Sequence, residues 1–287
     1  MLASLLHDLH FRLRAFRAGR SRPVVTWVDA QYGPAVLVML NSLYANNPNT
    51  QFDTLIFTPP GDRGVAQARF DFAALGVRFA RNIVVREVDD ARLRGLPLSG
   101  VLPYLSHATY GNLLLSGLVP AGSFLYLDSD MVVQEDIAPL LALPLGPALI
   151  AAVADWGDAS EWGVRLGIEN ADTYVNNGVM VVNAAAWRRE NILQRIFEWQ
   201  QRLGERAAFL DQDLLNVATV GRKKLLDPKW NVMQHALLKQ GRLHMVDATN
   251  FRGIFHFTGL PKPWTPHGPA QPRALYERYA WLSPLQM

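Results

Sequence analysis

Short apolar segments alternate with helical segments along most of this chain, and that alternation limits the fold more than any other feature. Helical patterns begin at Pro34 and cover 62–75 and 106–118. Strands that alternate with helices predict a mostly parallel sheet with helices on both faces, an α/β fold. Four apolar runs in the first half have strand character: 24–29 (VVTWVD), 52–58 (FDTLIFT), 82–88 (NIVVREV) and 123–128 (SFLYLD).

The second half of the chain has a weaker pattern. Residues 148–155 and 178–183 are predicted to be strands, and 187–203 and 211–220 are predicted to be helices. Residues 227–269 are rich in proline, glycine and aromatic residues without a clear period, which favours a loop or lid over a site. The simplest organisation is one α/β domain, residues 23–270, preceded by an N-terminal helix over 1–22 and followed by a helical tail over 271–287.

The basic charge of the chain lies in its N-terminal segment. Five arginines against one acid, Asp8, give residues 1–22 a charge of +4, so that the remaining 265 residues sum to about −1 out of a total of +3. A neutral body lacks the basic face that nucleic-acid binding requires. Apolar residues also recur at helical spacing over 2–16, which fits either a peripheral helix on an anionic membrane or a helix docked on protein.

Targeting signals are absent from the sequence pattern. No apolar run reaches the ~18 residues that a membrane-spanning helix needs. The N-terminal apolar residues are interrupted by His7, Asp8 and His10, which does not fit a secretory signal. We therefore expect a cytoplasmic protein, with peripheral contact to the inner face of the membrane as an option for the N-terminal helix.

Two aspartates follow the apolar run that ends at residue 127. Ligands of parallel α/β sheets bind at the carboxyl ends of strands, where Asp128 and Asp130 are predicted to lie. In extended backbone both carboxylates would face one side and Ser129 the other. Two carboxylates this close repel unless a cation lies between them, and a hard divalent cation would leave positions open for phosphate oxygens. The chain has no cysteine, so that any metal must be held by oxygen or imidazole ligands.

Three later segments concentrate polar residues beside apolar runs. They are YVNNGVMVVN (174–183), FLDQDLLN (209–216) and IFHFTGLPKPW (254–264). Taken alone, His256 could be a core histidine, Lys262 a solvated lysine and Asp211 a helix cap. Together with FLYLDSDMVV, in this order and at these separations, the segments resemble glycosyltransferase family 8. The likeness runs from about Val24 to Trp264, and VVTWVDAQYGPAVLVMLNSL fits the family's nucleotide-binding start.

The resemblance implies a single Rossmann-like, GT-A type domain that transfers a hexose from a UDP-sugar with retention. It implies that Asp128, Asp130 and His256 hold Mn²⁺, with Mg²⁺ as an alternative, and that the metal bridges the diphosphate. Gly259 and Lys262 match diphosphate-binding positions. The resemblance also implies a glycan or glycolipid acceptor, such as a lipopolysaccharide core.

Further positions match the family's donor and sugar sites. Asp29, Gln31 and Tyr32 match the uracil-binding positions, and Ser129 accompanies the two metal-binding aspartates. Asn176 or Asn177, Asp155, Asp211 and Gln212 match positions around the donor sugar and acceptor. Because the Gln212 amide is a poor nucleophile, the resemblance favours same-face transfer over a covalent intermediate.

One position departs from the family pattern. Many relatives have an arginine in a Y-x-R-L pattern before the DxD strand, where this chain has Asn112 within ATYGNLLL. This keeps open a donor-altered or non-catalytic UDP-sugar-binding protein. A sugar-phosphate nucleotidyltransferase is a further alternative, but the loop VDAQYGPA lacks the lysine or arginine expected in such enzymes.

Overall fold

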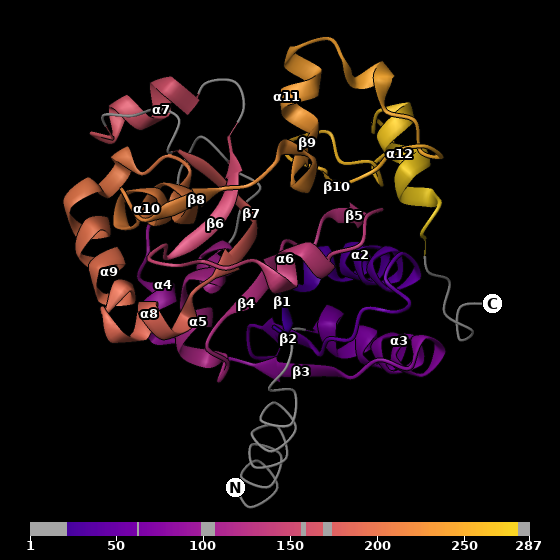
Figure 1. Cartoon of the computed structure of the whole chain (residues 1–287), viewed down its shortest axis with the longest axis horizontal. Helices are drawn as coiled ribbons and strands as arrows, with labels where there is room; N and C mark the ends of the chain where they lie inside the picture. Colours follow the sequence, from indigo (N-terminus) through magenta and orange to yellow (C-terminus); the bar gives the residue numbers. More distant parts are fainter. Residues whose placement is uncertain (1–21, 62, 99–106, 156–158, 169–173, 281–287) are drawn as a thin grey trace, which may run out of the picture.

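The computed structural model describes residues 22–61, 63–98, 107–155, 159–168 and 174–280. Its centre is a seven-stranded sheet in the order β3-β2-β1-β4-β7-β6-β8 (Figure 1). β7 pairs antiparallel with β4 and β6, and the other pairings are parallel, which confirms the predicted mostly parallel α/β sheet. The strands are β1 (Val24–Trp27), β2 (Thr54–Thr58), β3 (Ile83–Glu87), β4 (Phe124–Leu127), β6 (Ile150–Ala154), β7 (Val175–Val182) and β8 (Lys223–Leu225).

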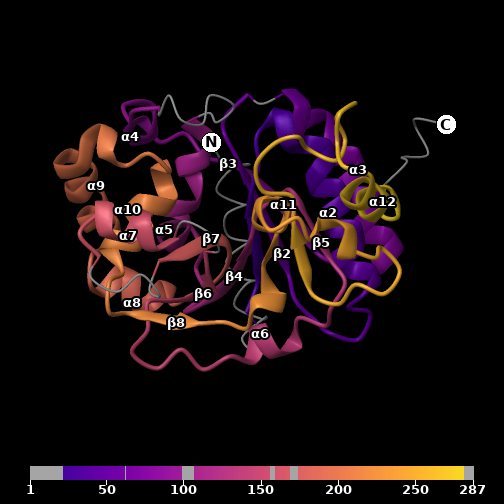
Figure 2. The ribbon, with the colours of Figure 1, turned by 90° about the horizontal axis from the view of Figure 1, so that it is seen from above.

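Helices cover both faces of this sheet, as Figure 2 shows from above. Strands β1, β2 and β4 are buried along their whole length, as expected for parallel strands between two helical layers. Alternate residues therefore enter different cores: Val25 and Tyr126 pack toward one layer, and Val24 and Leu125 toward the other. One layer contains α2 (Gly33–Ala45), α3 (Arg63–Phe79) and α6 (Ala138–Ala142), and the other contains α5 (Leu115–Leu118), α8 (Ala184–Arg189), α9 (Ile192–Leu203) and α10 (Leu210–Ala218).

Two strands of a second sheet lie in the region that lacked a clear sequence pattern. β5 (Met131–Val133), β10 (Ile254–His256) and β9 (Val232–Met233) form a three-stranded sheet with β10 in the middle. The helix α12 (Ala270–Glu277) packs on this sheet through Leu275, which is fully buried beside Phe255 and Phe257. The predicted loop over 227–269 is thus partly an ordered sheet that brings β10 against the chain segment after β4 (Figure 1).

The remaining elements are short. They are η1 (Ala30–Tyr32), α4 (Ala91–Arg94), η2 (His107–Leu114), α7 (Ala159–Arg165), η4 (Gly204–Arg206), η5 (Pro228–Trp230), α11 (Gln234–Lys239) and η6 (Leu243–Met245). The predicted helix 106–118 is mostly a 3-10 helix, η2, with only α5 as an α-helix. The predicted helix 187–203 is two helices, α8 and α9, which Asn191 separates by adopting a left-handed conformation with φ 51°.

Two predictions lie partly or wholly outside the described residues. The predicted N-terminal helix falls on residues 1–21, which are not described, and of the predicted tail only the part to residue 280 is described. Within the described ranges, no helix has both the length and the apolar character needed to cross a bilayer.

Candidate active site

A cavity of about 430 Å³ lies at the carboxyl end of the parallel strands. Asp29 reaches it from the segment after β1, Asp128 from the segment after β4, and Asp155 from the segment after β6. Asn176 and Asn177 reach it from the first residues of β7, because that strand runs antiparallel to β4. Asp211 and Gln212 contribute from α10. This is the edge at which open α/β sheets bind ligands.

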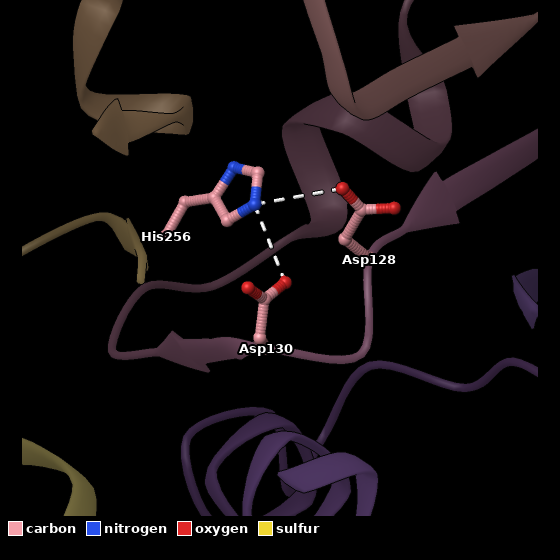
Figure 3. Close-up of side chains that lie close together, drawn as sticks. All are labelled: Asp128, Asp130 and His256. Carbon is pink, nitrogen blue, oxygen red and sulfur yellow. Dashed lines mark ion pairs between the residues drawn. The ribbon is translucent and has the colours of Figure 1, made fainter. Parts of the chain in front are cut away.

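Asp128, Asp130 and His256 converge in this cavity (Figure 3). Nε2 of His256, the last residue of β10, lies 3.5 Å from Oδ2 of Asp128 and 3.3 Å from Oδ1 of Asp130. One ligand atom from each residue falls within 4.8 Å of the others. The second sheet therefore completes the site, because its pairing of β10 with β5 brings His256 beside the two aspartates.

A chain of side-chain amides assigns the tautomer of His256. The backbone N–H of Gly178 donates to Oδ1 of Asn176 at 3.0 Å, so this atom is an acceptor. Nδ2 of Asn231 donates to the same oxygen at 2.7 Å, and Oδ1 of Asn231 must therefore face Nδ1 of His256, 3.1 Å away. In the neutral ring Nδ1 then carries the proton, and in either protonation state Nε2 is the nitrogen that faces the two carboxylates.

Gly178 permits this close packing. A Cβ atom at this position would lie 2.4 Å from Cε1 of His256 and 2.9 Å from Oδ2 of Asp128. Real Cβ contacts are not that short, so any side chain here would displace the imidazole or the carboxylate. The glycine of the NNG sequence is therefore required by the convergence of Asp128 and His256.

Lys262 and Tyr126 donate hydrogen bonds to the carboxylate oxygens of Asp130 and Asp128 that do not face His256. Nζ of Lys262 donates to Oδ2 of Asp130 at 2.6 Å and to the carbonyl of Phe257 at 2.7 Å. Burial alone would raise the pKa of Asp130, but the charges of Lys262 and His256 outweigh it and lower the pKa to about 2. Tyr126 donates to Oδ1 of Asp128 at 2.6 Å, while burial and the charge of Asp130 raise the pKa of Asp128.

These three residues fit a hard divalent cation. Two carboxylates and one imidazole nitrogen would supply an oxygen-rich donor set with a single nitrogen, which suits Mn²⁺ or Mg²⁺ better than a thiolate-seeking metal. The Nδ1–H of His256 is bonded to a protein acceptor, the arrangement usually found behind metal-binding histidines. The group is thus a candidate metal site on the chemistry of its own residues.

A second group of polar side chains surrounds Asp211. Oδ2 of this carboxylate accepts hydrogen bonds from Nδ2 of Asn112, at 2.6 Å, and from Nδ2 of Asn177, and Oδ1 accepts one from Thr109 at 3.2 Å. Burial raises the pKa of Asp211 to about 7, the nearby charge of Asp128 adds to the rise, and these neutral donors oppose it. Asp211 is therefore poised to change its charge near neutral pH.

Gln212 is held from three sides. Its Oε1 accepts from Asn176 at 3.0 Å, and its Nε2 donates to Oδ2 of Asp155 at 2.9 Å and to the hydroxyl of Tyr174 at 3.1 Å. Tyr174 in turn donates to Asp213 at 2.6 Å. Because Asn176 also bonds Asn231, one continuous network joins the imidazole of His256 to Gln212 and Asp155.

Twelve of the thirteen site residues predicted from the sequence line this cavity, and Gln31 does not. Gln31 is exposed, and its backbone N–H bonds Oδ1 of Asp29 at 3.1 Å. Ser129 also lines the cavity, at a place where the chain bends at Ser129 and Asp130 instead of staying extended. The twelve are Asp29, Tyr32, Asp128, Ser129, Asp130, Asp155, Asn177, Asp211, Gln212, His256, Gly259 and Lys262.

Sequence reasoning missed two side chains that position the metal-site group. Tyr126 could have been found, since it lies two residues before Asp128 on a strand and so faces the same side. Asn231 carries no comparable signal, because its short 3-10 helix and strand β9 follow no sequence period.

Comparisons with known proteins agree with this geometry. The model of the family named Glycosyl transferase family 8 matches residues 23–268. The lipopolysaccharide 1,3-galactosyltransferase of Salmonella typhimurium is 31% identical over 239 residues, which cover 79% of this chain and 68% of that protein. A lipopolysaccharide 1,2-glucosyltransferase of Escherichia coli is 26% identical over 252 residues, covering 84% and 72% of the two chains.

A solved structure shares the fold. The galactosyltransferase LgtC, in complex with donor and acceptor sugar analogues, superimposes with a TM-score of 0.75 at 24% identity, covering 90% of this chain and 95% of LgtC. The architecture is therefore the GT-A fold predicted from the sequence. With a family match over most of its length, this chain belongs to glycosyltransferase family 8.

Proposed function

We propose that this protein is a metal-dependent, retaining hexosyltransferase that uses UDP-glucose or UDP-galactose. The observation that carries the proposal is the convergence of Asp128, Asp130 and His256 in one cavity, with the cation of Lys262 beside them. A diphosphate needs opposing positive charge on both sides, which a bound divalent cation and Lys262 would supply together. The relatives named above are lipopolysaccharide glycosyltransferases, which supports a glycan or glycolipid acceptor such as a lipopolysaccharide core.

The donor would lie across the cavity from the uracil side to the sugar side. Asp29 and Tyr32 line one part, where a carboxylate can accept the uracil N3–H and a ring can stack on the base. Asp155, Asn177 and Asp211 line another, where their oxygens can accept hydrogen bonds from sugar hydroxyls. Mn²⁺, with Mg²⁺ as the alternative, would be held by Asp128, Asp130 and His256 and would neutralise the charge that develops on the leaving UDP.

The chemistry of Gln212 supports transfer without a covalent glycosyl-enzyme. Its amide is not ionisable, and its oxygen and nitrogen already bond Asn176, Asp155 and Tyr174. Retaining double displacement requires a carboxylate nucleophile at the anomeric carbon. Gln212 therefore orients its neighbours, and the leaving phosphate would take the proton of the acceptor hydroxyl on the same face of the sugar.

The alternatives have less support. The match to a glycosyltransferase family disfavours a nucleotidyltransferase. Asn112 was the feature that favoured a non-catalytic protein, but in the structure it bonds Asp211 inside the cavity rather than leaving a gap. An intact group of three ligands with Lys262 favours an active enzyme.

UDP release by the purified protein tests the proposal. The assay compares UDP-glucose, UDP-galactose and their N-acetyl forms with and without Mn²⁺, alongside an Asp130→Asn variant. We expect metal-dependent release from at least one donor and its loss in the variant. Release that proceeds equally in EDTA, or in the variant, would contradict the proposed role of the metal.

A further inference from the structure

Two buried polar atoms in the cavity wall have no hydrogen-bond partner within the described part of the chain. They are the indole Nε1 of Trp27 and the amide Oδ1 of Asn112. Their residues are 6% and 8% exposed, so neither atom can be satisfied by bulk water. Buried polar groups are almost always paired, and an unpaired donor or acceptor costs folding free energy. Two such atoms in one cavity wall therefore suggest a ligand that pairs them.

The two residues belong to the same corner of the cavity. The indole of Trp27 lies directly over Gly111: a Cβ there would be 1.9 Å from the ring and 2.4 Å from Nε1 itself. Asn112 is the next residue of the same 3-10 helix, η2. The glycine is what lets the indole approach this closely, and it brings Nε1 beside the residue that carries the unpaired oxygen.

Each atom has a fixed hydrogen-bonding role. The indole nitrogen can only donate. The Asn112 amide is oriented by Asp211, whose ionised carboxylate accepts from Nδ2 at 2.6 Å, so that the unpaired atom is the acceptor Oδ1. This corner thus offers one donor and one acceptor. Its complement is a group that can both accept and donate.

A second buried tryptophan gives the contrast. Nε1 of Trp187 donates to the carbonyl of Leu149 at 3.1 Å, and this residue does not line the cavity. The chain therefore pairs a buried indole N–H where burial is purely structural. The unpaired one belongs to a residue that lines the cavity.

We propose that Trp27 and Asn112 form a specificity-determining pair that binds one uncharged polar substituent of the donor sugar. The substituent both accepts from the indole and donates to the amide oxygen, which a hydroxyl or an acetamido group can do. A carboxylate substituent is disfavoured because it cannot donate a hydrogen bond to Oδ1 of Asn112. It would also be repelled by the charge of Asp211, which bonds Asn112 and forms no ion pair with a cation in the described ranges. This inference rests on the proposed function and names the part of the site that selects the donor.

Calorimetry of the Trp27→Phe variant tests the pair, since this change removes the N–H and keeps an aromatic ring. The ligands are UDP, UDP-glucose, UDP-galactose, UDP-N-acetylglucosamine and a set of UDP-monodeoxyglucoses, all with Mn²⁺. We expect UDP to bind the variant as it binds the wild type, and the preferred UDP-sugar to bind about three- to tenfold more weakly. The wild type should bind the deoxy donor that lacks the recognised hydroxyl more weakly than it binds the parent UDP-sugar. The Trp27→Phe variant should bind this deoxy donor no more weakly than the wild type does. If the acetamido form is the preferred ligand, the same loss should appear with UDP-N-acetylglucosamine.

Trp187→Phe is the matched control. It breaks a paired indole bond, so its thermal unfolding temperature should fall further than that of Trp27→Phe, while its affinity for UDP-sugars should stay at the wild-type value. Equal binding of every UDP-sugar to wild type and Trp27→Phe, with UDP binding intact, would overturn the inference and leave the proposed function standing. A wild-type protein that binds no UDP with Mn²⁺ would instead overturn the proposed function, and this inference with it.

Discussion

Oδ1 of Asn231 accepts a hydrogen bond from Nδ1 of His256 at 3.1 Å, and this contact leaves Nε2 free to face Asp128 and Asp130. Replacing Asn231 with Ala removes the acceptor that fixes the tautomer and the ring orientation. We expect the affinity for Mn²⁺ to fall by about 10- to 100-fold, the usual effect of losing a partner behind a metal-binding histidine. Titration followed by electron paramagnetic resonance of free Mn²⁺ measures this directly.

Asn231→Asp is the informative companion, since its carboxylate keeps an acceptor for Nδ1 of His256 but loses the donor to Asn176. We expect it to recover much of the metal affinity. Wild-type affinity in Asn231→Ala, with the far-ultraviolet circular dichroism spectrum unchanged, would mean that Asn231 does not position the imidazole.

Gly178→Ala should abolish metal binding by steric means. The added Cβ would lie 2.4 Å from Cε1 of His256, so the imidazole must move away from the two carboxylates. Gly122→Ala is the matched control, because a Cβ at Gly122 meets nothing within 4 Å. Both variants are measured by Mn²⁺ titration, and equal affinities in the two would rule out the tight packing between Gly178 and His256.

Replacing Gln212 with Ala should slow transfer without stopping it. The amide holds Asp155 and Tyr174 in place, so we expect a loss of about 10²-fold in turnover, the scale typical of a lost positioned hydrogen-bond donor. The measurement is single-turnover transfer with donor binding checked separately. Complete loss of transfer with unchanged donor affinity would point to a covalent role for this position.

Asp211 should make the metal-free protein less stable as the pH rises. Its pKa is raised from 3.8 to about 7 by burial, so between these values the unfolded chain releases a proton that the folded protein retains. The free energy of unfolding then falls as pH rises through this window, and the loss is complete above about pH 7. In Asp211→Asn, urea unfolding in EDTA at pH 4, 5.5 and 7 should show a flatter dependence. Parallel curves for the two proteins would mean that Asp211 keeps an ordinary pKa.

The parts of this structure that follow local rules could be predicted from the sequence. The buried runs of β1 (VVTW), β2 (TLIFT) and β4 (FLYL) consist of β-branched, aromatic and leucine residues, and the position of Asp128 at a strand end predicts a ligand site at that edge. The break between α8 and α9 could not be predicted, because Asn191 interrupts a pattern that otherwise continues.

The parts that depend on long-range pairing could not be predicted from local pattern. His256 reaches Asp130 only because β10 pairs with β5, more than a hundred residues away along the chain, and both strands are just three residues long. The partner of its imidazole, Asn231, comes from yet another segment. Family resemblance supplied His256 as a ligand where periodicity could not.

Calorimetry of UDP binding with and without Mn²⁺, in the wild type and in Asp130→Asn, tests the central claim most directly. It requires neither the correct sugar nor an acceptor. A metal-dependent nucleotide-sugar site predicts tight UDP binding with Mn²⁺, binding at least tenfold weaker in EDTA, and loss of that difference in the variant. UDP binding of equal strength with and without the metal, or no UDP binding in either condition, would contradict it.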